Sequence, residues 1–181
     1  MTDLTRRTAL TALGVALALP ALADAAPVWG FSFPSIEEGT LNFADYRGRV
    51  LLVVNTASFC GYTYQYEALE KLHATLTPKG LTVIGMPSQD FGQESGTDGA
   101  VKAFCEATFG VQFPMTGLVH VKGPQANPFH TWVRAQKSWE PDWNFNKVLI
   151  GRDGAILSLY RSGDEPDGPA LSGAIGSALT A

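Results

Sequence analysis

The chain has little cysteine, little histidine and little positive charge, and each shortage excludes a class of function. Its 181 residues include two cysteines and three histidines, and no Cys/His spacing fits a zinc site. Thirteen Lys and Arg residues against 17 Asp and Glu residues give a net charge of −4, whereas nucleic-acid binding favours clustered positive charge. We therefore expect no metal, no cofactor and no nucleic-acid partner. The histidines are interpreted as surface residues or satisfied core residues, namely His73, His120 and His130.

Long apolar runs are absent after the N-terminus, and no later segment is apolar enough to span a membrane. A basic pair, Arg6 and Arg7, precedes an apolar stretch over residues 9–22, and small residues follow it. This order is that of a secretory signal peptide, and the arginine pair is typical of twin-arginine export. The run is short for a bilayer span, which makes a membrane anchor the lesser alternative. We expect residues 1–25 to be a signal peptide for export to the periplasm and 26–181 to form one domain without stable membrane insertion.

The two cysteines, Cys60 and Cys105, leave several hypotheses open. Two cysteines in an exported chain are consistent with a structural disulfide. A C-x-x-C redox pair is not indicated, because Thr63 stands where the second cysteine of "CGYT" would be. Cys60 follows an apolar run and precedes a predicted helix, whose N-terminal N–H groups favour an anion such as a thiolate. From position alone, a reactive thiol and an inert core cysteine are equally good interpretations of Cys60.

Apolar runs that alternate with amphipathic stretches predict an α/β fold. The runs over 50–56 and 81–86 are continuous and rich in β-branched residues, which is typical of strands covered on both faces. An amphipathic helix over 64–76 joins them in a βαβ unit. We also expect a short hairpin over 28–48, a polar loop over 87–99, a helix over 100–110 and a strand over 118–121. A helix over 127–136, a hairpin over 147–160 and a terminal helix over 169–179 are expected to follow. This order predicts a thioredoxin-like fold, with a mixed central sheet flanked by helices.

Polar residues follow the predicted strands at the edge of the sheet where α/β proteins bind ligands. Gln93 lies in the loop after the second strand, and Trp143 and Asn144 come just before the final hairpin. If the sheet forms as predicted, these segments can converge on Cys60. Indole and amide N–H groups are donors, and donors aimed at sulfur stabilise a thiolate and the charge on a leaving oxygen. A tryptophan with only a packing role is the commoner outcome, so these residues alone leave the site a hypothesis.

Three motifs, in order, resemble the glutathione peroxidase family. "NTASFCGYTYQYEAL" is similar to the family segment N-V-A-S-x-C-G-x-T-x-Q-Y, "GMPSQDFGQESG" to G-F-P-C-N-Q-F-G-x-Q-E-P-G, and "WNFNKVLIGRDG" to W-N-F-x-K-F-L-V. The resemblance implies that Cys60 is the peroxidatic thiol, and that Gly61 lets the backbone bend close to its sulfur. It also implies three hydrogen-bonding partners for that thiol, namely Gln93, Trp143 and Asn144.

The chain departs from the family pattern in the second motif. The loop that holds Gln93 is one residue shorter than in the family, which leaves the placement of this side chain open. Ser88 stands where the family has a cysteine that is not thought essential. The segment "FCEATFGVQFP" resembles the one that holds the resolving cysteine of thioredoxin-dependent members, which implies that role for Cys105.

The resemblance implies a cycle in which Cys60 becomes a sulfenic acid, Cys105 attacks it to form a disulfide, and an external dithiol reduces that disulfide. A disulfide needs Cα atoms ~4.4–6.8 Å apart. Cys105 lies in a predicted helix, whereas Cys60 is expected to face Gln93 and Trp143. We therefore expect the two cysteines to be well separated when reduced, and the helix of Cys105 to unwind in part.

The resemblance thus implies a thiol peroxidase that reduces hydrogen peroxide or organic hydroperoxides in response to oxidative stress. The reductant would be glutathione or a thioredoxin-like protein, and Cys105 favours the second. Tetrameric relatives carry an insert between the positions of Trp132 and Trp143, where this chain is short, so the resemblance implies a monomer with an open site. A non-enzymatic redox sensor or relay would use the same residues and stays as the alternative.

Overall fold

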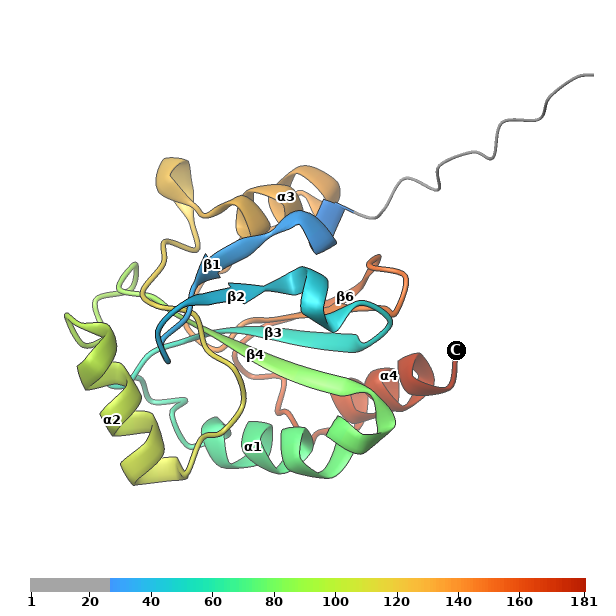
Figure 1. Ribbon diagram of the computed structural model, residues 1–181, viewed down its shortest axis with the longest axis horizontal. Helices are drawn as coiled ribbons and strands as arrows, with labels where there is room; N and C mark the ends of the chain where they lie inside the picture. The colour runs from blue at the N-terminus through green and yellow to red at the C-terminus, as the bar shows by residue number, and fades with distance from the viewer. Residues whose placement is uncertain (1–26) are drawn as a thin grey trace, which may run out of the picture.

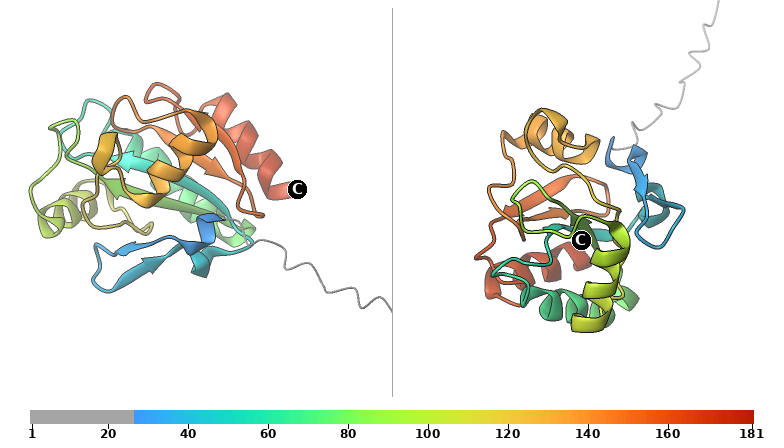
Figure 2. Two further views of the ribbon diagram at one scale, coloured as in Figure 1. Left: turned by 90° about the horizontal axis from the view of Figure 1, so that it is seen from above. Right: turned by 90° about the vertical axis from the view of Figure 1, so that its left-hand side faces the viewer.

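The structure is a computed structural model that describes residues 27–181. The expected signal segment over 1–25 lies outside the described residues. A central sheet carries helices on both faces, and a small N-terminal hairpin lies beside it (Figure 1, Figure 2). Between residues 27 and 181, no helix combines the length and apolarity that a bilayer span requires. The mixed sheet flanked by helices is the architecture that the sequence predicted.

The central sheet has the strand order β4-β3-β5-β6. β3 (Val50–Thr56) pairs in parallel with β4 (Leu81–Pro87) and antiparallel with β5 (Lys147–Ile150), which pairs antiparallel with β6 (Ile156–Tyr160). All seven residues of β3 and all seven of β4 are buried, which explains why both runs are continuously apolar. Because β3 and β4 are parallel, their carboxyl ends finish together, with Thr56 opposite Pro87.

Four helices cover the sheet. α1 (Gln65–Leu76) and α4 (Pro169–Thr180) pack on one face, and α3 (Pro128–Lys137) packs on the other (Figure 1). α2 (Asp98–Phe109) lies where β3 and β4 end; Thr97 caps its N-terminus, and Gly110 ends it with a positive φ of 62°. The shorter elements are the strands of the N-terminal hairpin and four 3-10 helices: β1 (Ser32–Pro34), β2 (Thr40–Asn42), η1 (Pro27–Gly30), η2 (Phe43–Tyr46), η3 (Thr77–Lys79) and η4 (Gly123–Gln125).

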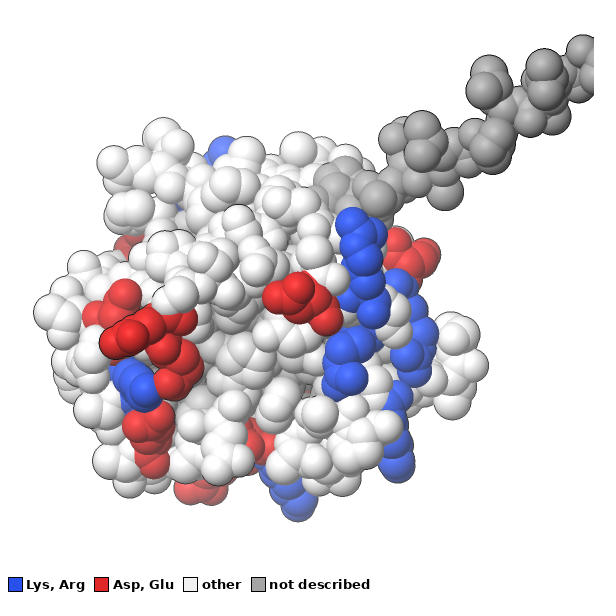
Figure 3. Space-filling model, in the orientation of Figure 1, with Lys and Arg blue, Asp and Glu red and all other residues white. Residues whose placement is uncertain are grey.

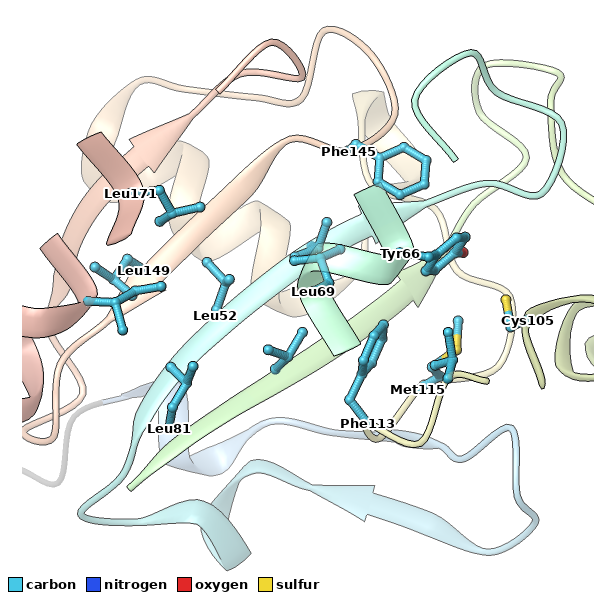
Figure 4. Close-up of a cluster of buried hydrophobic side chains, with 14 of the residues drawn as sticks. Leu52, Tyr66, Leu69, Leu81, Cys105, Phe113, Met115, Phe145, Leu149 and Leu171 are labelled. Carbon is cyan, nitrogen blue, oxygen red and sulfur yellow. The ribbon is translucent and has the colours of Figure 1, made fainter. Parts of the chain in front are cut away.

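The side chains of β3 alternate between two hydrophobic cores, one on each face of the sheet. Leu52 and Val54 belong to the core under α1, α2 and α4 (Figure 4). Leu51 and Val53 belong to the core under α3 and the N-terminal hairpin. Since successive side chains of a strand point to opposite faces, a strand at the centre of such a sheet buries both of its faces, and residues 50–54 of β3 are accordingly all apolar. Packing in the two cores holds the sheet in place, and the sheet in turn positions the loops that meet at its edge.

One predicted strand is wrong, because residues 118–121 form no strand. The chain nearby makes an isolated parallel bridge between Gly85 and Met115. The N–H of Val119 donates to the carbonyl of Pro87, but the N–H of Val121 donates to the carboxylate of Asp90. Because the Asp90 carboxylate accepts the N–H of Val121 that a β-ladder would need, residues 118–121 lie beside β4 without adding a strand to the sheet.

His130 illustrates a satisfied core histidine, as the sequence analysis expected. Its side chain is buried, and its Nδ1 accepts a hydrogen bond from the Asn127 amide at 2.9 Å. His73 accepts the N–H of Val83, and the exposed His120 pairs with Asp90. Burial lowers the pKa of His130 to about 3, well below its usual value. The folded protein therefore keeps this ring neutral at a pH at which the unfolded chain protonates it.

This difference makes stability depend on pH. Because the folded pKa lies below the unfolded value of ~6.5, the unfolded state binds the extra proton between the two, and stability falls as pH falls. We expect His130 alone to lower the free energy of unfolding by ~1.4 kcal/mol per pH unit below about pH 6. Urea unfolding at several pH values should show a shallower slope for His130→Gln, whose amide oxygen can still accept from Asn127. Equal slopes for wild type and His130→Gln would contradict this account.

Candidate active site

Cys60 lies in the loop between β3 and α1, at the edge where β3 and β4 end. The residue is only 5% exposed, and its Sγ accepts the N–H of Tyr62 at 3.5 Å. Turn residues 61–64 separate Cys60 from α1, so the N–H group at the sulfur belongs to this turn. A Cβ added at Gly61 would meet nothing within 4 Å, and its φ is not in the positive range. The structure therefore shows no steric need for glycine beside the thiol.

Gln93 approaches the Cys60 loop from the loop after β4. The N–H of Phe59 donates to the backbone carbonyl of Gln93 at 2.9 Å. The side-chain amide of Asn144 donates to Oε1 of Gln93 at 3.1 Å. The shorter loop thus still brings Gln93 against Asn144 and beside the residue that precedes Cys60. In this structure the two amides bond to each other, whereas the sulfur receives a backbone N–H.

Asn55 and Asn146 hold the turn that carries Trp143 and Asn144. The side-chain amides of Asn55 and Asn146 both donate to the Trp143 carbonyl, at 3.0 and 2.9 Å. The backbone N–H of Asn146 in turn donates to Oδ1 of Asn55 at 3.1 Å. Phe145, which stands between Asn144 and Asn146 in the chain, is fully buried and has a positive φ of 61°. Neither asparagine was predicted from the sequence, although each is a polar residue next to or within an apolar run.

Removing the Asn55 side chain is expected to loosen this turn. Asn55→Ala leaves the buried N–H of Asn146 without its acceptor, and an unpaired buried polar group costs ~1–3 kcal/mol. We expect the free energy of unfolding to fall by ~2 kcal/mol in urea titrations. Asn42→Ala is the matched control, because the Asn42 side chain makes no capping hydrogen bond at its helix. An Asn55→Ala protein as stable as the control would show that this network contributes little.

Two aromatic pairs flank the Cys60 region. Phe59 is 65% exposed and its ring lies 6.1 Å from that of Phe104, measured between centroids. Trp143 is 40% exposed, and its ring lies 5.4 Å from that of Phe91. Among residues 27–181, the Trp143 indole makes no hydrogen bond to the sulfur. Exposed aromatic rings beside a buried thiol form an apolar rim that can receive an apolar molecule or a partner surface.

Cys105 lies on α2 and is almost completely buried. Both cysteines are free thiols in this structure. Burial raises the pKa of Cys105 to about 11, so the thiol is protonated near neutral pH. The residue lines a pocket of about 190 Å³ with Ile36, Val111 and Met115. The structure is therefore a reduced form with α2 intact over Asp98–Phe109, and the unwinding of this helix stays a prediction.

Glu94 is a buried carboxyl group that the sequence analysis did not assign. Its Oε1 accepts the N–H groups of Ser58 and Ser95, at 3.0 and 2.7 Å. Burial raises the pKa of Glu94. Glu94 thus ties the Cys60 loop to the segment that leads into α2. In the part of the chain that the structure describes, no group of three or more His, Cys, Asp or Glu side chains is placed to hold a metal ion.

Comparison with known proteins gives consistent matches. The family model described as glutathione peroxidase matches residues 28–134. A hydroperoxy fatty acid reductase of Synechocystis sp. is 38% identical over 151 residues, which cover 77% of this chain and 89% of that protein. A glutathione peroxidase-like peroxiredoxin of Schizosaccharomyces pombe is 37% identical over 130 residues, which cover 69% of this chain and 82% of that protein.

Solved structures support the fold. The crystal structure of Trgpx in its apo form superposes with a TM-score of 0.67 at 30% identity, covering 84% of this chain and 95% of that one. A thiol:disulfide interchange protein of the thioredoxin family from Chlorobium tepidum gives a TM-score of 0.61 at 16% identity, covering 82% and 92%. At that identity the second match concerns the fold alone. The predicted thioredoxin-like fold is therefore confirmed.

Proposed function

Because this chain belongs to the glutathione peroxidase family and is a thiol peroxidase that reduces hydroperoxides in the response to oxidative stress, we propose that Cys60 is its peroxidatic cysteine. The observation that carries the proposal is the meeting of three loops at one edge of the sheet. Gln93 and Asn144 are hydrogen-bonded to each other there, and Gln93 also accepts the N–H of the residue before Cys60. A nucleophile beside convergent donors is what reductive cleavage of an O–O bond requires.

The proposed first step is attack of the Cys60 thiolate on one peroxide oxygen. The S–O bond forms as the O–O bond breaks, and the attacked oxygen keeps its proton as the sulfenic hydroxyl. The second oxygen leaves as water or an alcohol with the proton that the Cys60 thiol gave up on ionising. Gln93, Trp143 and Asn144 are proposed to donate to the sulfur and to the leaving oxygen. For that, the amide of Asn144 turns from Oε1 of Gln93 toward the peroxide. The unpartnered Oδ1 of Asn144 leaves this amide free of a second protein contact.

The second proposed step joins Cys60 to Cys105. The Cys105 sulfur attacks the sulfenic sulfur, the S–S bond forms, and the hydroxyl oxygen leaves as water. Because Cys105 is buried within the last turns of α2, the helix must open for this step. A dithiol then reduces the disulfide by exchange.

We further propose that organic hydroperoxides are substrates and that a thioredoxin-like protein is the reductant. The exposed rings of Phe59 and Trp143 support an apolar substrate, and the Synechocystis relative is named for hydroperoxy fatty acids. A buried second cysteine supports a dithiol reductant. The basic and apolar segment over 1–25 supports export, so the proposed site of action is the periplasm and the proposed state a monomer.

Steady-state turnover with a panel of substrates and reductants tests this proposal. The purified protein, with residues 1–25 removed, is assayed with hydrogen peroxide and a fatty-acid hydroperoxide, and with glutathione or a thioredoxin-like protein. We expect kcat/KM for the protein dithiol to exceed that for glutathione at least about tenfold, which corresponds to ~1.4 kcal/mol. Turnover with glutathione alone would overturn the proposed reductant. N-terminal sequencing of periplasmic protein tests the export proposal, and a native mass tests the monomer.

A further inference from the structure

Lys147 is a fully buried cation to which the proposed reaction cycle gives no role. It is the first residue of β5 and lies three positions after Asn144 in the chain. Its ammonium group lies within hydrogen-bond distance of four oxygen atoms, and none of the four belongs to a carboxylate. They are Oε1 of Gln65 and the backbone carbonyl oxygens of Arg161, Ser162 and Asp164.

The burial of this charge sets Lys147 apart from the cations at the surface. Acidic side chains gather over α2, for example, and Lys102 pairs there with Glu37 and Glu106 in contact with solvent (Figure 3). An ammonium group that leaves water is costly unless hydrogen bonds replace its hydration. Burial lowers the pKa of Lys147 to about 8, so the group is still mainly charged at neutral pH and keeps three N–H donors. An apolar side chain would satisfy packing at this position, so the retained charge calls for another explanation.

The ammonium group of Lys147 joins the loop after β6, residues 161–164, to the start of α1. It donates to the carbonyl of Asp164 at 2.6 Å and to Oε1 of Gln65 at 2.7 Å. Gln65 is the first residue of α1, and its side-chain amide donates to the carbonyl of Ser162 at 2.7 Å. Gln65 and Ser162 are both buried, so water cannot easily replace these bonds. Lys147 therefore holds the loop and the helix together.

Ser162 connects this loop to the turn that carries Asn144. Its hydroxyl donates to the backbone carbonyl of Asn144 at 2.6 Å and accepts the side-chain amide of Asn146 at 3.1 Å. Asn144 is the residue whose side-chain amide bonds to Gln93. The backbone from which this amide projects is thus fixed by the Ser162 hydroxyl.

Gln65 connects the same loop to the turn beside the sulfur. The backbone N–H of Gln65 donates to the carbonyl of Tyr62 at 3.0 Å. The N–H of Tyr62 is the group that donates to Sγ of Cys60 at 3.5 Å. The N–H donor at the sulfur and the turn of Asn144 are therefore both linked by hydrogen bonds to one buried ammonium group.

We propose that Lys147 is a positioning residue for the oxidation of Cys60. It acts through Ser162 on Asn144, and through Gln65 on the turn beside the sulfur. This inference rests on the proposed role of Asn144 as a donor to the peroxide. Displacing a group that acts on the reacting atoms by ~1 Å can slow a reaction ~100-fold, so a side chain that never touches the peroxide can still set the rate.

The experiment is a double-mutant cycle between Ser162 and Asn144, with the rate of Cys60 oxidation as its readout. Reduced protein is mixed with hydrogen peroxide, and the Cys60 thiol that remains at successive times is alkylated and measured by mass spectrometry. We expect Ser162→Ala to slow this oxidation about tenfold and Asn144→Ala about 100-fold. The double variant should match Asn144→Ala within about twofold, because the Ser162 hydroxyl acts on the rate only through Asn144.

Three further variants complete the test. Ser162→Thr keeps a hydroxyl and should restore most of the wild-type rate. The matched control is Ser158→Ala, which removes from β6 a hydroxyl that bonds only to the Tyr160 hydroxyl, and it should keep the wild-type rate. Lys147→Met removes the ammonium group and should slow oxidation at least about tenfold. Urea unfolding shows whether this variant is folded, and the Ser162 cycle decides the matter if it is not.

Each result that would overturn the inference has its own meaning. Oxidation of Cys60 at the wild-type rate in Ser162→Ala would show that the hydroxyl has no influence on the reaction. Equal slowing by Ser162→Ala with and without Asn144→Ala would show that the serine only stabilises the fold. If Asn144→Ala itself keeps the wild-type rate, the proposed role of Asn144 fails and takes this inference with it, while the peroxidatic role of Cys60 stands. A Cys60 thiol that wild-type protein never oxidises would instead overturn the proposed function.

Discussion

Cys60→Ser is expected to abolish peroxide turnover, with a loss of at least about 10⁴-fold in kcat, as for other nucleophile replacements. Serine has a similar shape, but its hydroxyl is hardly ionised near neutral pH and cannot form the sulfenic acid on which the cycle depends. The measurement is reductant consumption in a coupled assay with a fatty-acid hydroperoxide. Because Cys60 is buried, circular dichroism and urea unfolding should accompany the assay.

The control for Cys60→Ser is a change at a thiol-free position of the same loop. Tyr64→Phe keeps the ring at an exposed position of this loop and should leave turnover intact. A folded Cys60→Ser protein with activity within tenfold of wild type would contradict the assignment of Cys60 as the reacting atom.

Cys105→Ser is expected to uncouple the two halves of the cycle. Oxidation of Cys60 should proceed, because the thiol and the residues proposed to act on the peroxide are unchanged. Turnover with a thioredoxin-like reductant should fall at least about 100-fold, since no disulfide is formed for the dithiol to exchange with. Cys60 should then accumulate as sulfenic acid and, with excess peroxide, as sulfinic acid.

The readouts for Cys105→Ser are the coupled rate and the mass of the peptide that contains Cys60. Cys105 is buried and packs in the core under α1, α2 and α4, so Cys105→Ala serves as a second variant that adds no hydroxyl to this core. Full thioredoxin-coupled turnover in both variants would contradict a resolving role and favour direct reduction of the sulfenic acid.

The parts of the fold that were predicted correctly are those with local signals. The continuous apolar runs of β3 and β4 predicted two covered parallel strands, and the hairpin predicted over 147–160 is formed by β5 and β6. The run over 118–121 carries the same apolar signal but forms no strand, because Asp90 takes the N–H of Val121. That contact joins residues of two different loops, and no local pattern contains it.

In the candidate site, too, the residues with local signals were predicted and those that depend on distant contacts were not. Cys60, Trp143 and Asn144 were singled out because they lie beside predicted strand ends and match family motifs. The position of Gln93 could not be predicted from a shortened loop, and its contact with Asn144 appears only in three dimensions. Asn55 and Glu94 were missed because their roles depend on partners far away along the chain, Trp143 and Ser58. The resemblance supplied expected roles, whereas the contacts that hold the site come from the fold.

Peptide mass mapping of the wild-type protein after one equivalent of hydrogen peroxide tests the central claim most directly. Reduced protein should first show both thiols free, as in this structure. After peroxide, the account predicts a Cys60–Cys105 disulfide as the main product, with no other residue oxidised. A Cys60 thiol that is still free after the peroxide has been consumed would contradict the account, because the oxygen would then have been accepted elsewhere in the chain.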